Sequence, residues 1–181
     1  MAGSELVGRE EFESIKKLWK KGQGNIYRYG VNQYAVQEFE KRFADYMGCK
    51  YAHAVSSGTA AIHCALSAAG ISSGDEVITT SFTFVAPIEA ILAVGATPIP
   101  VDVDESFHLD PDMVEKAIGP KTKSILTIPM WASPKMAKFE SLCKKYNLTL
   151  IEDAAQCLGG TYEGRKLGTI GKIGSFSFDS G

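Results

Sequence analysis

The segment EVITTSFTFVAPIEAILAVGATPIPV, residues 76–101, decides the fold, because it predicts a strand, a helix and a second strand in succession. Glu76–Thr80 and Thr97–Val101 are short runs of apolar and β-branched residues, and Val85–Val94 between them has the length of a helix. A membrane span is excluded, since Glu89 and three prolines interrupt the apolar part and a spanning helix needs about 20 apolar residues. We therefore expect a buried helix followed by a buried strand.

The same alternation of strands and helices continues on both sides of this segment. Further strands are expected at Tyr51–Val55, Ser124–Ile128, Leu148–Ile151 and Ser175–Phe178. Further helices are expected at 9–21, 34–47, Gly58–Ala69, Asp110–Ala117 and Lys135–Tyr146. Alternating elements with short apolar strands predict an α/β three-layer sandwich with a mostly parallel central sheet. In such sheets ligands bind at the carboxyl ends of the strands.

Composition narrows the class of protein. The chain has 181 residues, of which 45% are hydrophobic, and a formal net charge of -2, so it is long enough for a real core and is not a disordered chain. Balanced charge argues against nucleic acid or a membrane surface as partner. The N-terminus shows no apolar signal region, and the four cysteines are scattered without a C-x-x-C pair. We expect a cytoplasmic protein with reduced thiols.

The first candidate site is SSGTAA, residues 56–61, between an expected strand and an expected helix. The first amides of a helix have no partner within the helix and favour an anion, and the hydroxyls of Ser57 and Thr59 add donors. This pattern indicates a phosphate site, or else an ordinary helix N-cap by one of these hydroxyls. It is not a P-loop, because no G-x-x-x-x-G-K-[ST] motif occurs.

The second candidate is LTLIEDAAQ, residues 148–156, in which a buried strand ends in two acids. Glu152 and Asp153 should point to opposite sides of the sheet, so a shared acid–base pair is not expected. One of them holds a cationic ligand nitrogen, or Asp153 caps the following turn. Two further strand ends are ambiguous: TSFTF (80–84) is core or a stacking platform, and GSFSFDSG (174–181) is a turn or a second set of phosphate donors.

Two other kinds of site are not expected. The spacing of Cys49, His53, His63 and Cys64 matches no standard zinc site, so these residues are interpreted as structural. A serine hydrolase is also excluded, because the chain has no G-x-S-x-G elbow.

Taken together, the motifs at 56–62, 74–104 and 151–181 follow in the order and approximate spacing of one family. The sequence resembles the DegT/DnrJ/StrS family of pyridoxal-phosphate-dependent sugar aminotransferases, which have the fold type I architecture. The resemblance runs from about residue 24 to the end of the chain and covers the first half of a typical member. It implies an N-terminal helical arm, 1–33, and an incomplete cofactor-binding large domain, 34–181, without the small C-terminal domain.

The resemblance assigns roles at the phosphate end of pyridoxal 5′-phosphate. Gly58 and Thr59 would hold the phosphate at the helix N-terminus, and Ser177 would be a further donor. A dianionic phosphate suits a helix terminus with clustered hydroxyls.

It also assigns roles around the pyridine ring. Phe84 matches the aromatic residue that stacks on the ring, Asp153 would pair with the N1–H, and Gln156 would contact the 3-hydroxyl. A carboxylate at N1 keeps the ring protonated, so that the ring accepts the charge of a carbanion.

The family's Schiff-base lysine directly follows the strand that ends the present sequence. That position comes immediately after Gly181, and neither Lys166 nor Lys172 occupies it. These two lysines lie in a polar segment and are expected at the surface. We expect the protein to continue beyond Gly181, because in this architecture the strand after the lysine inserts into the sheet, and without it two strand edges would stay unpaired.

The activity implied is transfer of an amino group from glutamate or glutamine to a nucleotide-linked keto-sugar, as in deoxyamino-sugar and polysaccharide biosynthesis. The family also implies a homodimer with shared active sites. Two alternatives stay open: a sugar dehydratase with histidine in place of the lysine, and a non-catalytic protein that binds cofactor or sugar. Pro129 and Ala132 depart from the His-Met-x-Gly found in many members, which leaves the identity of the sugar open.

Overall fold

The computed structural model describes residues 8–22, 33–130 and 134–179. The expectations that concern Gly24, Ala132 and Gly181 lie outside these residues. The chain forms two compact units, Met1–Ala54 with Asp179–Gly181, and Val55–Phe178. The proposed boundary between an arm and a large domain at residue 33 stays a prediction.

The first unit contains the two expected N-terminal helices, α1 (Arg9–Lys21) and α2 (Gln33–Met47). The apolar residues that predict α1 lie along one side of it, and Phe12, Ile15 and Trp19 are each more than half exposed. In α2, by contrast, Met47 is buried. Val36 and Phe39 of the same helix are exposed. Helical spacing therefore predicts both helices, but it does not predict how much of their apolar faces is buried.

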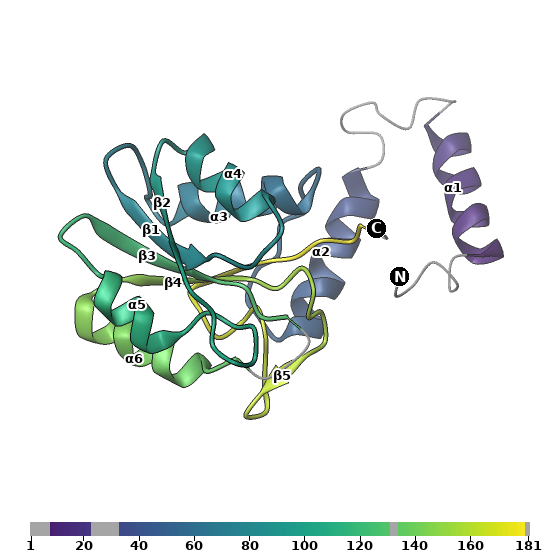
Figure 1. Cartoon of the computed structure of the whole chain (residues 1–181). Helices are drawn as coiled ribbons and strands as arrows, with labels where there is room; N and C mark the ends of the chain where they lie inside the picture. The colour runs from purple at the N-terminus through teal and green to yellow at the C-terminus, as the bar shows by residue number, and fades with distance from the viewer. Residues whose placement is uncertain (1–7, 23–32, 131–133, 180–181) are drawn as a thin grey trace. The chain divides into compact units, whose positions relative to one another are not determined.

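The second unit is a three-layer α/β sandwich (Figure 1). Its sheet has the order β2-β1-β3-β4-β7, all parallel, with bounds Glu76–Thr80 (β1), Thr97–Val101 (β2), Thr122–Thr127 (β3), Thr149–Asp153 (β4) and Ile173–Ser175 (β7). The helices are α3 (Gly58–Ala68), α4 (Ala86–Ala93), α5 (Pro111–Ala117) and α6 (Met136–Tyr146). Helices α3 and α4 cover one face, and α5 and α6 the other (Figure 1). No helix in the described ranges is long and apolar enough to cross a membrane.

The core is divided by the sheet, because successive strand residues point to opposite faces. Val77 of β1 and Ile151 of β4 pack with α3 and α4, while their neighbours Ile78 and Leu150 pack with α5 and α6. Both faces are therefore apolar, which explains why these strands appear in the sequence as short continuous apolar runs.

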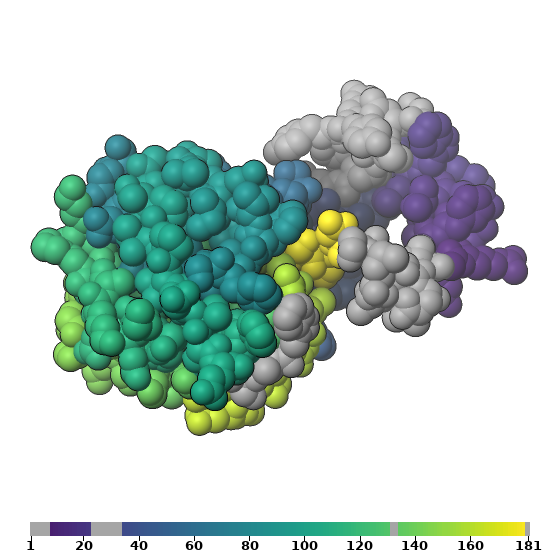
Figure 2. Space-filling model, viewed as in Figure 1, coloured from purple at the N-terminus to yellow at the C-terminus, as the bar shows by residue number. Residues whose placement is uncertain are grey.

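Strand β2 is an edge strand that contains two prolines, and the segment around it, coloured teal, faces the viewer in Figure 2. The residues that flank the two prolines carry bonds to the rest of the sheet. The Thr97 N–H donates to Asp75 O (2.9 Å), and Val101 O accepts from the Ser81 N–H (2.8 Å). Since Pro98 and Pro100 alternate with these residues, their missing N–H groups would have pointed away from β1.

The expected strand Tyr51–Val55 is wrong. These residues have no ladder partner in the described parts of the chain, and Tyr51 is 78% exposed. The Ala54 N–H donates instead to the Glu40 carboxylate (2.9 Å). The apolar–aromatic pattern is typical of a strand, but a strand also needs a neighbour for its backbone groups.

The last strand is displaced from its expected position, Ser175–Phe178, to Ile173–Ser175. Its partner β4 ends at Asp153, which pairs with Ser175, so the ladder stops there. A short hairpin, β5 (Thr161–Tyr162) and β6 (Arg165–Lys166), is not among the expected elements. Its turn, Glu163-Gly164, has positive φ at both residues (50° and 78°), and Gly164 is the sequence signal for it.

Candidate functional site

The N-terminus of α3 lies at the carboxyl edge of the sheet, as the sequence predicts. Ser57 is the N-cap, and its Oγ accepts a hydrogen bond from the Ala60 N–H (3.1 Å). The interpretation as an ordinary N-cap is therefore confirmed for Ser57. The amides of Gly58 and Thr59 have no hydrogen-bond partner in the described part of the chain, so they are available to an anion.

Ser177 lies against this helix terminus. A Cβ added to Gly58 would be 2.9 Å from Ser177 Cβ and 3.2 Å from its Oγ. The glycine thus lets the chain after β7 approach the first turn of α3. Two predicted phosphate residues that are far apart in the sequence come together here.

The two acids at the end of β4 lie on opposite sides of the sheet, as predicted. Glu152 is fully buried and its carboxylate accepts three backbone N–H groups: Gly168 on Oε2 (2.7 Å), and Ile170 (2.7 Å) and Gly171 (2.6 Å) on Oε1. Burial raises the pKa of Glu152, while these three amides act in the opposite direction. Glu152 is therefore occupied in holding the loop that leads into β7.

Replacing this carboxylate is expected to destabilise the fold. In Glu152→Gln an amide NH₂ faces at least one backbone N–H that it cannot accept, and we expect a loss of about 2 kcal/mol in the free energy of unfolding. Urea denaturation measures it. The control is Glu140→Gln, which removes an acid from a partly exposed ion pair with Arg165 and should cost less than about 1 kcal/mol. Equal losses in the two variants would contradict this assignment.

Asp153 is the acid that faces the α3 side of the sheet. It is 6% exposed, and burial raises its pKa to about 6, against the opposing hydrogen bonds. Its Oδ1 accepts from the Ala155 N–H (3.3 Å) and the Ser175 hydroxyl (3.5 Å), and both described bonds reach this one oxygen. A cationic group at Oδ2 would stabilise the ionised form. The bond from Ala155 is the turn cap that the sequence allowed for Asp153. Its role at a cationic ligand nitrogen stays a prediction.

Phe84 and Gln156, the two residues predicted to contact the pyridine ring besides Asp153, lie at the same edge of the sheet without a described contact to it. Phe84 lies between β1 and α4 and is 69% exposed, and Gln156 is exposed in the turn after β4. Both follow the carboxyl ends of strands, at the edge where Asp153 lies. No hydrogen bond or ring contact in the described residues joins either of them to Asp153, so their roles stay predictions.

Other expectations around the site can be placed as well. Lys172 is exposed and Lys166 half-buried, and Pro129 is buried. The described residues contain no group of three or more metal-ligating side chains. Ser175 belongs to the segment 174–181, for which the sequence left a turn or a set of phosphate donors open, and the contact of its hydroxyl with Asp153 is not among those expectations. The signal for it is its position at the end of β7, beside β4.

The geometry fits pyridoxal phosphate at both ends. Two unpartnered amides and a serine at a helix N-terminus suit a dianionic phosphate. The buried Asp153, whose pKa is elevated by the loss of water, suits a protonated ring nitrogen. These groups suit a molecule with an anion at one end and a cationic nitrogen at the other.

Comparison with known proteins supports the same conclusion. The sequence profile of the DegT/DnrJ/EryC1/StrS aminotransferase family matches residues 8–181. The chain belongs to this family. A GDP-perosamine synthase from Caulobacter vibrioides is 43% identical over 145 residues, which is 79% of this chain and 39% of that protein.

Solved structures give the same result. The aminotransferase from Psychrobacter cryohalolentis superposes with a TM-score of 0.87 at 37% identity, covering 95% of this chain and 43% of that one. NtdA from Bacillus subtilis, solved with bound cofactor PMP, gives 0.77 at 35% identity over 90% of this chain and 38% of its own. The chain spans less than half the length of these family relatives.

Proposed function

We propose that the protein is a pyridoxal-phosphate-dependent aminotransferase that moves an amino group from glutamate or glutamine to a nucleotide-linked keto-sugar. The observation that carries the proposal is Asp153, a buried carboxylate at the end of β4, on the face of the sheet that α3 covers. The names of the similar proteins, GDP-perosamine synthase among them, support the reaction class.

Different residues contact the phosphate, the ring face and the ring nitrogen of the cofactor. The amides of Gly58 and Thr59, with Ser177, bind the phosphate, and Phe84 covers one face of the ring. When bound, the cofactor supplies an electron sink for the carbanion formed as an amino acid loses its α-proton. Asp153 holds the proton on the ring nitrogen that makes this sink effective.

Further parts of the proposal concern the rest of the site. Gln156 contacts the ring oxygen, and a lysine immediately after Gly181 carries the cofactor and transfers protons. A second copy of the chain completes the site in a homodimer, located in the cytoplasm. Histidine at the lysine position would favour a dehydratase instead.

The experiment is an assay of the intact protein with glutamate or glutamine and nucleotide-linked keto-sugars, with the amino-sugar product identified by mass spectrometry. Cofactor-dependent formation of amino sugar is expected. Loss of water from the sugar without nitrogen transfer would support the dehydratase. Cofactor or sugar binding without any turnover would support a binding protein.

The phosphate site can be tested by binding alone. Ser177→Ala removes one donor to a charged group, so the dissociation constant for pyridoxal 5′-phosphate should rise about tenfold. Titration calorimetry measures it. Pyridoxal, which lacks the phosphate, is the control and should bind both proteins equally. An equal effect on both ligands would show that Ser177 acts elsewhere.

A further inference from the structure

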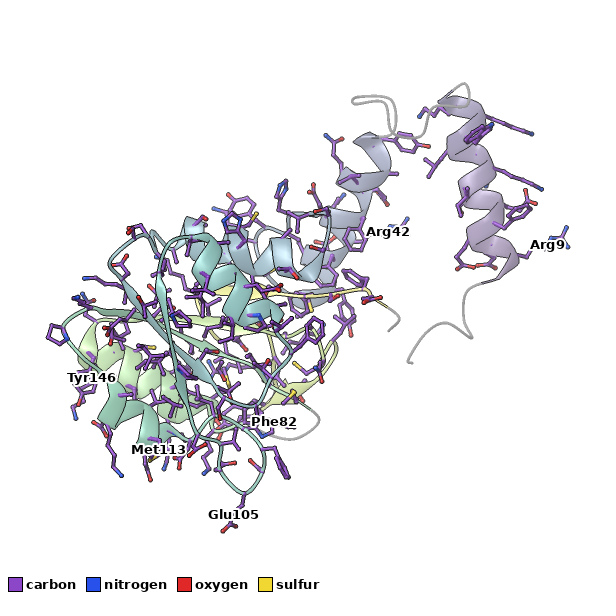
Figure 3. All side chains as sticks on the ribbon, turned by 45° about the horizontal axis from the view of Figure 1, so that its top comes forward. Arg9, Arg42, Phe82, Glu105, Met113 and Tyr146 are labelled. Atoms are coloured by element: carbon purple, nitrogen blue, oxygen red, sulfur yellow. The ribbon has the colours of Figure 1, made fainter. Side chains whose placement is uncertain are left out.

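A buried histidine outside the cofactor contacts lies in the loop between β2 and α5. His108 is 3% exposed, whereas Glu105 in the same loop points outward (Figure 3). His108 Nε2 lies 2.7 Å from Met130 O and 3.2 Å from Met130 N. A protonated Nε2 donates to the carbonyl, and an unprotonated one accepts from the amide. The backbone of Met130 is held in both cases.

The same loop also reaches the residue before α6. Ser106 Oγ lies 3.1 Å from His108 Nδ1 and 2.5 Å from Asp104 Oδ1, and Asp104 Oδ2 lies 2.6 Å from Lys135 Nζ. Burial alone would raise the pKa of Asp104, but bonds from Lys135 and Ser106 hold it well below its usual value. The loop therefore holds Met130 through His108 and Lys135 through Asp104, and Ser106 links these two side chains.

Met130 lies at the middle of the carboxyl edge. It comes three residues after the end of β3, the central strand of the sheet order β2-β1-β3-β4-β7. Thr127 at the end of β3 pairs with Glu152, the neighbour of Asp153. The chain leaving β3 therefore emerges between the strand that precedes Phe84 and the strand that carries Asp153. If the ring lies at Asp153, as the proposed function has it, this segment is a neighbour of the ring.

We propose that His108 is a positioning residue for the sugar substrate. Through the backbone of Met130 it fixes where the chain after β3 runs beside the ring, while Asp104 fixes Lys135. The inference rests on the proposed function, which places the ring at Asp153. His108 contacts neither cofactor nor substrate in this account, so its loss affects substrate binding and leaves cofactor binding intact.

A matched pair of variants tests the contact. Glutamine places its amide nitrogen where His108 has Nε2, and asparagine reaches only as far as Nδ1. His108→Asn should speed hydrogen exchange in the peptide that ends at Met130 by about tenfold and raise the KM for the keto-sugar by a similar factor. His108→Gln should restore both. Cofactor affinity should stay within twofold of the parent in each variant.

A milder variant covers the case in which His108→Asn does not fold. Ser106→Ala keeps the ring but removes its Nδ1 partner, so exchange near Met130 and the KM should rise by a smaller factor. Parent-like exchange and KM in both His108→Asn and Ser106→Ala would overturn the inference. So would an equal rise in exchange throughout Val55–Phe178, since that shows a general loss of stability.

The two proposals fail in different ways. If the parent protein binds no pyridoxal phosphate and transfers no amino group, the proposed function is wrong. If the parent is active and the keto-sugar KM does not respond to the His108 substitutions, only the positioning role is wrong.

Discussion

The Asp153→Asn variant is expected to lose about a hundredfold in amino transfer. A neutral amide cannot stabilise the protonated ring nitrogen, and loss of an opposite charge at contact distance changes a pKa by about 1–3 units. The protonated fraction of the ring, and with it the rate, should fall by a comparable factor. Steady-state kinetics of the intact protein measures the change.

The same substitution should stabilise the protein without cofactor. The pKa of Asp153 is about 6 in the folded chain against an ordinary 3.8, so the folded state binds the proton more tightly than the unfolded state. Stability therefore falls as pH rises from about 4 to about 6, and the full cost is present above that range. We expect Asp153→Asn to raise the free energy of unfolding by up to about 3 kcal/mol at pH 8, and by little at pH 4.

Asp102→Asn is the matched control, because Asp102 also follows the carboxyl end of a strand but is exposed. It should change neither activity nor the pH profile of stability. A parent-like rate in Asp153→Asn would remove the central residue of the proposed function. If Asp153→Asn is more stable at pH 8 but keeps its activity, Asp153 is a buried acid that has no role at the cofactor.

The second large effect is expected at Gly174. A Cβ at this position would lie 2.0 Å from Gly168 O and 2.7 Å from Gly168 C, and backbone atoms cannot move aside as a flexible side chain can. Gly174→Ala must push β7 away from the loop that Glu152 holds. We expect a loss of about 3 kcal/mol or more, measured by thermal or urea denaturation.

Gly119→Ala provides the control, since its added Cβ would meet Glu76 Oε2 at 3.7 Å, an ordinary contact. A change within about 0.5 kcal/mol is expected there. Similar stabilities for the two alanine variants would show that β7 and the 168–171 loop tolerate separation.

Much of the central unit is predictable because its pattern is local. The apolar runs of β1 and β2, and the helical length between them, follow from residues 76–101 alone. Asp110-Pro111 likewise predicts the start of α5, and the Asp110 side chain does accept from the Asp112 N–H (2.9 Å). Where side-chain pattern and local capping agree, the structure matches the expectation closely.

The wrong predictions concern strands, because the bounds of a strand depend on the neighbouring strand with which it pairs. Tyr51–Val55 has a strand's composition but no ladder, and Ser175–Phe178 alternates as a strand should although its neighbour β4 stops at Asp153. Neither fact is visible in the segment itself. The side-chain pattern indicates whether a segment prefers the strand conformation, but a strand forms only where a neighbouring strand is available to pair with it.

The candidate site shows the same division. Position at strand ends and helix starts marked the segments 56–61, 148–156 and 174–181, and the family resemblance then selected Gly58, Asp153 and Ser177 within them. Position alone did not separate the roles of Glu152 and Asp153, since that depends on three amides from a distant loop. Nor did it single out His108, whose partner Met130 lies 22 residues away.

The prolines of β2 determine at which edge the sheet can accept a further strand. An incoming strand would find no donors at Pro98 and Pro100, so the outer side of β2 resists docking by another chain and the runaway stacking that leads to fibres. The opposite border, β7, has no such block. A further strand is therefore expected to pair with β7, the edge strand next to the strand that carries Asp153. This holds for a strand of the same polypeptide and for one of a misfolded neighbouring molecule.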